Sequence, residues 1–142
     1  FCTGPGRTVL EAGELLVSID VPRPAANSGA AYTRFIPRNE MDIAVAGSGV
    51  SVVLSDDKSS IVSARVALAS VAPTPLFVTE AGDFLAGKKI SDDVIAEAGQ
   101  IAKKAAKPIT DMRGTIEQRK HLCDVLTRRA LTGAIARAKE AN

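Results

Sequence analysis

Side chains that could bind an anionic or carbonyl group gather in the stretch TRFIPRNEMDIAVAG, residues 33–47. Its polar members precede a run of small apolar residues and are Arg34, Arg38, Asn39, Glu40 and Asp42. Arg38 and Asp42 are close enough in sequence to pair across a turn, which would fix the connection between two strands. Alternatively, Arg34 or Arg38 would donate hydrogen bonds to a ligand held mostly elsewhere. The residues alone leave both interpretations open.

A second charged cluster, DMRGTIEQRK at residues 111–120, precedes a helical pattern. Asp111 and Arg113 could pair with each other, and Arg119 could reach back to a sheet. We therefore expect these three residues to have a structural role rather than a ligand role.

The sequence offers few other groups for chemistry. His121 is the chain's one histidine, and it falls outside the apolar band of its helix, so we expect an exposed surface residue. Cys123 belongs to that band, and a spacing of two residues does not bring two side chains to one metal. The sequence thus predicts neither a metal site nor catalytic residues. An independent small enzyme is disfavoured because no nucleophile–base pair is evident.

Composition limits the possible partners. The net charge of +2 and the aromatic content of 4% argue against nucleic acid and against a membrane surface. No apolar run approaches the length that spans a bilayer. The glycine-containing segment TGPGRT (3–8) lacks the spacing of a phosphate-binding loop, and no dinucleotide-binding glycine pattern occurs. Cys2 and Cys123 are too few for a disulfide scaffold and fit a reducing compartment, which predicts a cytoplasmic location.

The elements that must position these residues fall into two halves. Alternating or β-branched patterns predict strands at 15–21, 30–36, 41–54 and 61–71. Helical spacing predicts helices within 74–88, 91–107 and 115–138. Strands followed by helices predict an α+β fold, in which a three- to four-stranded antiparallel sheet is covered on one face by three helices.

Several details of these elements are also predicted. The expected helix caps are Thr79, Ser91 and Thr115. In the last strand, one face should carry Val62, Ala64, Val66 and Leu68. Gly47 and Gly49 suggest a bulge or a bend in the strand before it.

Three motifs are specific in combination: Arg-x-x-x-Asp-Ile-Ala from Arg38 to Ala44, APTPL at 72–76, and the Asp-x-Arg…Arg set of Asp111, Arg113 and Arg119. With the stretches around them, which cover nearly the whole chain, they resemble the C-terminal domain of the FAD-binding (medium) subunit of molybdenum hydroxylases. That group includes aerobic carbon monoxide dehydrogenases and xanthine dehydrogenases. The family often has a tyrosine where this chain has Gln118, so a site role at that position does not carry over.

The resemblance implies that FAD is held chiefly by preceding domains, through glycine-rich loops outside this chain. The loop RFIPRNEMD (34–42) would approach the flavin, so that Arg34, Arg38 and Asp42 would line the flavin side of the site. It also implies a division into a linker at 1–12, a domain at 13–138 and a tail at 139–142.

The resemblance further implies two partner subunits. A large subunit would carry the molybdenum cofactor, and a small one would carry 2Fe–2S clusters that pass electrons to FAD and then to an acceptor. This chain would be a supporting domain of that oxidoreductase. The alternative is a pure subunit-docking domain without a ligand role.

Overall fold

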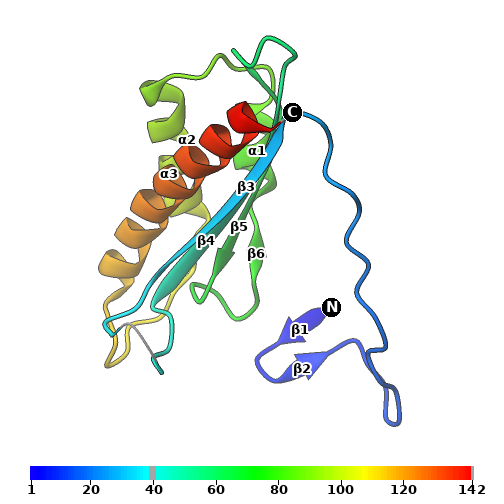
Figure 1. Cartoon of the computed structure of the whole chain (residues 1–142). Helices are drawn as coiled ribbons and strands as arrows, with labels where there is room; N and C mark the ends of the chain where they lie inside the picture. The colour runs from blue at the N-terminus through cyan, green and yellow to red at the C-terminus, as the bar shows by residue number, and fades with distance from the viewer. Residues whose placement is uncertain (39–40, 142) are drawn as a thin grey trace.

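The computed structural model describes residues 1–38 and 41–141. Its main sheet is antiparallel, has the order β3-β4-β5-β6, and carries helices on one face (Figure 1). The strands are β3 (Ser28–Phe35), β4 (Ala46–Leu54), β5 (Ile61–Ala69) and β6 (Leu76–Phe77), and the helices are α1 (Thr79–Leu85), α2 (Asp92–Ala105) and α3 (Ile116–Glu140). A separate hairpin consists of β1 (Cys2–Gly4) and β2 (Arg7–Thr8). The predicted α+β architecture is confirmed.

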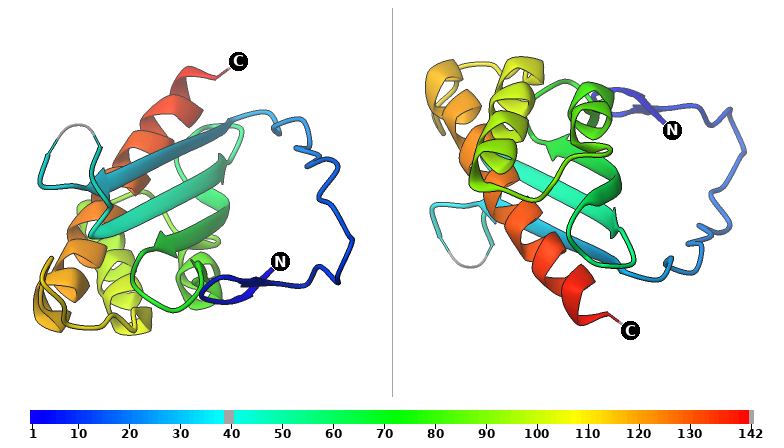
Figure 2. Two further views of the ribbon diagram at one scale, coloured as in Figure 1. Left: turned by 90° about the horizontal axis from the view of Figure 1, so that it is seen from below. Right: turned by 90° about the horizontal axis from the view of Figure 1, so that it is seen from above.

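Both views in Figure 2 show the three helices on one face of the sheet. The core lies between these two layers. The strands alternate because one face is buried and the other is not. In β4 the side chains of Val50, Val52 and Leu54 point into the core, while those of Ser51 and Val53 point away from it.

Helix α3 packs against β3 and β4 at very short range. The buried members of its predicted apolar band are Cys123, Leu126, Ala130 and Ala134. Gly29 of β3 lies directly under the helix, where a Cβ atom would be 2.2 Å from the carbonyl oxygen of Ala134 and 2.5 Å from the backbone nitrogen of Ala138. The sheet therefore reaches the helix backbone itself, and only glycine fits at this point.

Two of the three predicted helix caps are present. The hydroxyls of Ser91 and Thr115 accept hydrogen bonds from the backbone N–H groups of Val94 and Gln118. Thr79 does not cap α1: it is the first helical residue, and Val78 precedes it without a capping side chain.

The predicted strand at 15–21 is wrong. The segment is extended but has no strand partner in the part of the chain that the structure describes, and the fourth strand of the sheet is β6 instead. A meander would have placed it along the free edge of β3. There the carbonyl of Ala30 already accepts a hydrogen bond from Arg137 of α3.

The structure corrects two details of β4 and β5. Val62 is exposed rather than in the core, because the pairing register shifts between Val53 and Leu54 and places Ile61 inward in its stead. Gly47 lies in a regularly paired stretch and marks neither a bulge nor a bend. It makes room for Tyr32, whose hydroxyl would be 2.6 Å from a Cβ at this position.

We expect Gly29→Ala to lower the free energy of unfolding by about 2–3 kcal/mol, because the added methyl meets helix backbone that cannot rotate away. The matched control is Gly49→Ala, where the nearest atom to the new Cβ is 3.6 Å away. Urea unfolding followed by circular dichroism measures both variants. Equal midpoints for the two would contradict the close packing of β3 and α3.

Candidate functional site

The segment after β3 is organised around the carboxylate of Asp42, whose side chain is 3% exposed. Its Oδ1 accepts hydrogen bonds from Arg113 Nη1 at 2.8 Å and from the N–H of Ile43 at 2.9 Å. Its Oδ2 accepts one from the N–H of Arg38 at 3.1 Å, and Arg38 Nε lies 3.8 Å away. The predicted pairing of Arg38 with Asp42 is therefore present. The stronger partner, Arg113, was not predicted.

A second carboxylate, Asp111, joins this segment to the sheet. Nη2 of Arg119 lies 2.6 Å from both oxygens of Asp111, and Nη1 of Arg119 donates to the carbonyls of Val45 and Ser70. Arg119 thus reaches the sheet, as predicted. The predicted side-chain pairing of Asp111 with Arg113 is wrong, because only the backbone N–H of Arg113 donates to Asp111.

Together these contacts form one chain of alternating charges, which we call the arginine–aspartate network. Its members in order are Arg38, Asp42, Arg113, Asp111 and Arg119. The tight turn from Asp111 to Gly114, closed by two backbone hydrogen bonds, brings the two carboxylates into one network. The network therefore fixes the backbone of the segment after β3 relative to the start of α3.

The network lowers the pKa of both carboxylates. Burial alone would raise the pKa of Asp42, but hydrogen bonds from Arg113, Arg38 and Ile43 outweigh it and hold the pKa below 3.8. The backbone N–H of Arg113 and the guanidinium of Arg119 hold the pKa of Asp111 below 3.8 as well. Both groups are consequently charged at neutral pH and bind their arginines as carboxylates.

Three side chains beside the network point into solvent. Arg38 has a side chain that is 71% exposed, and Met41 and Ile43 are 96% and 63% exposed. Asp42 accepts hydrogen bonds from the backbone N–H groups of Arg38 and Ile43, so the surface beside the network carries one cation and two apolar side chains. Such a surface can pack on a flat apolar ring and donate a hydrogen bond at its rim.

Arg34 is not part of the network. It lies on β3 opposite Gly47 of β4, is exposed, and belongs to the sheet face that points away from the helices. Of the three residues that sequence reasoning placed on the flavin side, the structure brings together Arg38 and Asp42 and leaves Arg34 apart. Asn39 and Glu40 lie outside the described residues.

The remaining candidates have the environments that the sequence indicated. His121 is exposed on α3. Cys123 is buried among apolar groups, and burial raises its pKa to about 11, so the thiol is protonated and unreactive at neutral pH. Within residues 1–38 and 41–141, no cluster of three or more potential ligands is placed to bind a metal. No helix among those residues is long and apolar enough to cross a membrane.

A buried polar cluster between α2 and α3 escaped the sequence analysis. Asp124 accepts a hydrogen bond from Gln100 and lies 2.9 Å from Arg128 Nε. Gly99 leaves room for it, since a Cβ there would be 2.3 Å from Asp124 Oδ1. The spacing of Asp124 and Arg128 by one helical turn was the available signal. The cluster joins two helices and has no feature of a ligand site.

The fold and the network define a known class of domain. Residues 31–134 match the family described as the CO dehydrogenase flavoprotein C-terminal domain. This stretch is more than half of the chain. It contains the whole network and the elements from β3 to α3, apart from the first residues of β3 and the end of α3. The chain belongs to this family.

Relatives in the same family show how close the similarity is. The chain is 37% identical to the carbon monoxide dehydrogenase medium chain of Afipia carboxidovorans, over 93% of this chain and 45% of that protein. It is 27% identical to the putative xanthine dehydrogenase FAD-binding subunit of Escherichia coli, over 97% of this chain and 47% of that subunit. A chain of a solved carbon monoxide dehydrogenase from Hydrogenophaga pseudoflava superposes with a TM-score of 0.88 at 33% identity. The superposition covers 94% of this chain and 46% of that one. The chain thus spans about half the length of these relatives.

We expect Arg119→Met to lower the free energy of unfolding by about 2–3 kcal/mol, because Asp111 and two carbonyl groups lose their donor together. Arg129→Met on the same helix is the control, since Arg129 is exposed. Urea unfolding of both variants measures the difference. A midpoint for Arg119→Met equal to that of the control would mean that the network does not stabilise the fold.

The lowered pKa values predict a specific loss of stability in acid. A carboxyl group whose pKa is lower in the folded state stabilises the fold above its unfolded pKa, and this contribution disappears as pH falls through the folded pKa. For Asp42 and Asp111 the loss begins near pH 4 and continues below it. We expect Asp111→Asn to be less stable than the wild type at pH 6 and to approach it as the pH falls.

Urea midpoints between pH 6 and pH 2.5 test this expectation. Asp83→Asn removes an exposed carboxylate from α1 and is the matched control. A constant difference between the wild type and Asp111→Asn at every pH would show that the ionised form of Asp111 is not what stabilises the fold.

Proposed function

We propose that this chain is the C-terminal domain of the FAD-binding subunit of a molybdenum-containing hydroxylase, and that the segment after β3 faces the flavin. The observation that carries the proposal is the solvent exposure of Arg38, Met41 and Ile43 beside the buried carboxylate of Asp42. Solvent-exposed apolar side chains beside hydrogen-bonded charged groups are typical of a binding surface. The family membership supports the proposal, since relatives are named as FAD-binding subunits.

The described residues fit one side of a flavin and not the whole cofactor. A dinucleotide needs a backbone cradle for its phosphates, and the sequence has no glycine pattern of that kind. Met41 and Ile43 would pack on the ring system and exclude water, and Arg38 would donate a hydrogen bond at its edge. Asp42 would hold Arg38 and Ile43 in place, and Arg34 would lie at the margin of the surface that faces the flavin. The rest of the cofactor would be held by preceding domains.

In the full assembly, FAD would pass electrons from 2Fe–2S clusters on a small subunit to an external acceptor. The clusters would receive them from a molybdenum cofactor on a large subunit. This chain's own residues would position the segment and keep its backbone in place through the arginine–aspartate network. We place the protein in the cytoplasm because both cysteines of the chain are free.

The alternative is a docking domain that binds a partner subunit through its helices and does not touch the cofactor. The position of the exposed groups favours the flavin role: they lie beside Asp42, at the end of the sheet where β3 ends and β4 begins. A docking function alone would not require that position.

The first experiment is the visible absorption spectrum of the full-length polypeptide that contains this chain. Flavin absorption is expected, and a colourless protein that does not take up added FAD would overturn the proposal. In the flavin-containing protein, we expect Arg38→Gln and Ile43→Ser each to weaken FAD binding by about tenfold, or ~1.4 kcal/mol. Val62→Ser, at the other end of the sheet, should leave it unchanged. Unchanged binding together with failed assembly would favour the docking alternative.

A further inference from the structure

The last turn of α3 ends without the residue that often terminates a helix. The final backbone carbonyls of any helix have no partner within it, and many helices end with a glycine in the left-handed conformation, which satisfies some of them. Here the residue after the helix, Ala141, is extended instead, with φ −67° and ψ 132°. The last carbonyls of α3 are therefore left to water or to a donor from another part of the fold.

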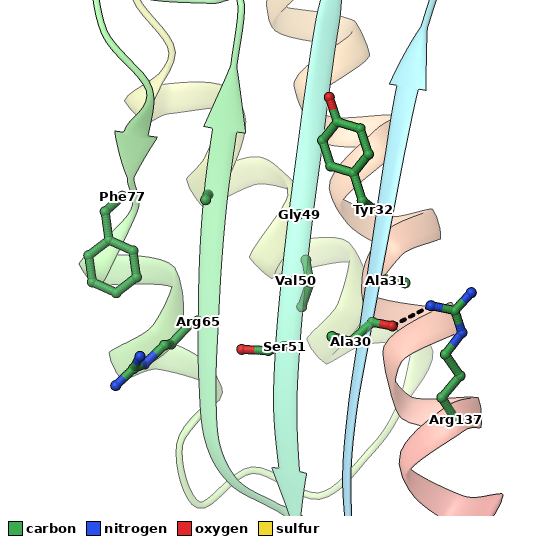
Figure 3. Close-up of a pocket in the computed structure, with 10 residues that line it drawn as sticks. Ala30, Ala31, Tyr32, Gly49, Val50, Ser51, Arg65, Phe77 and Arg137 are labelled. Atoms are coloured by element: carbon green, nitrogen blue, oxygen red, sulfur yellow. Dashed lines mark hydrogen bonds between the residues drawn. The ribbon is translucent and has the colours of Figure 1, made fainter. Parts of the chain in front are cut away.

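The basic residues of this turn do not supply the donor. Lys139 is exposed, and Arg137 points to the sheet, where its Nη1 donates a hydrogen bond to the carbonyl of Ala30 in β3 (Figure 3). This contact joins the side of the helix to the edge strand. Among the described contacts, neither side chain reaches the last carbonyls of α3.

The donor comes from the turn that joins β4 to β5. Nζ of Lys58 lies 2.8 Å from the carbonyl oxygen of Lys139 and 2.8 Å from that of Ala141. These acceptors are 81 and 83 residues away in the sequence. Figure 1 shows the turn and the end of α3 at the same end of the molecule. The charge of the ammonium group is also favourable here, because the C-terminal end of a helix carries a partial negative charge.

The backbone at Lys58 indicates that this side chain has a specific role. Its φ is 56°, which lies in the left-handed region. Glycine adopts this conformation at little cost and is common in hairpin turns, whereas the Cβ of lysine makes it unfavourable. A lysine at such a position is explained if its side chain makes contacts that outweigh the strain. The two hydrogen bonds to the end of α3 are contacts of this kind.

Hydrogen bonds within the turn hold Lys58 in this conformation. Its backbone N–H donates to the carbonyl of Ser55 at 2.8 Å. The carboxylate of the preceding residue, Asp57, accepts hydrogen bonds from the hydroxyls of Ser55 and Ser59 and from the N–H of Ser59. Because the turn is ordered by its own contacts, little additional freedom is lost when the lysine side chain binds the helix.

We propose that Lys58 caps α3 and fixes the end of this helix on the sheet, and we call Lys58 with its two carbonyl acceptors the lysine cap. Arg119 joins the start of the same helix to the sheet, so α3 is attached at both ends by a cation bound to backbone carbonyls. The last turn lies over β3, where Gly29 meets the backbone of Ala138. Opening the lysine cap would therefore loosen this end of the helix while the arginine–aspartate network stays closed. The inference does not depend on the flavin proposal.

The test is hydrogen exchange of the last turn in the full-length polypeptide that contains this chain. Lys58→Met removes the ammonium group and keeps an unbranched side chain, and Lys104→Met, which removes an exposed lysine from α2, is the matched control. We expect the backbone amides of residues 138–141 to exchange about tenfold faster in Lys58→Met than in the control, because two hydrogen bonds from a charged donor are lost. The amides of residues 120–123, at the start of α3, should exchange equally in both variants.

A second variant separates the side chain from the strained backbone. Lys58→Gly removes the ammonium group and also relieves the left-handed strain, so we expect it to melt at a higher temperature than Lys58→Met. Exchange at residues 138–141 should nevertheless be as fast as in Lys58→Met. Wild-type protection in Lys58→Gly would mean that the ammonium group does not hold the end of the helix, and would overturn the proposal.

Two results with the first variant would also contradict the lysine cap. Equal exchange at residues 138–141 in Lys58→Met and Lys104→Met would mean that the two hydrogen bonds do not hold the last turn. Faster exchange along the whole of α3 would mean that Lys58 stabilises the fold as a unit and not the end of one helix.

Discussion

One buried guanidinium, that of Arg119, is the contact on which the other parts of the site depend. It joins the residue before β4, the residue after β5 and the turn before α3 by hydrogen bonds to Val45, Ser70 and Asp111. Arginine can do this because its planar group offers several donors in fixed directions and remains charged when buried. Lysine has neither property. The start of the longest helix is thereby tied to two strand ends that lie far from it in sequence.

The position of the segment after β3 follows from that contact. Asp111 binds Arg119 and, through the turn that it closes, directs Arg113 toward Asp42. The carboxylate of Asp42 then accepts hydrogen bonds from the backbone N–H groups of Arg38 and Ile43. The surface proposed to face the flavin is therefore tied by hydrogen bonds to the turn before α3 and, through Arg119, to the sheet.

The sequence predicted what depends on local pattern and missed what depends on distant contacts. The fold class and the caps at Ser91 and Thr115 follow from periodicity and from hydrogen bonds within three residues. Asp42 was singled out, but its main partner Arg113 lies 71 residues away and is brought there by tertiary packing. Residues 15–21 show the converse: their alternation is that of a strand, but they have no strand partner among the described residues.

The contact between β3 and α3 has a consequence for how this family can diverge. A Cβ at Gly29 would meet backbone atoms of Ala134 and Ala138, so no change of a neighbouring side chain can create the missing space. Most core positions can drift, because an enlarged residue is accommodated when a facing one becomes smaller. Position 29 has no such route, and it can change during evolution only if the whole helix shifts.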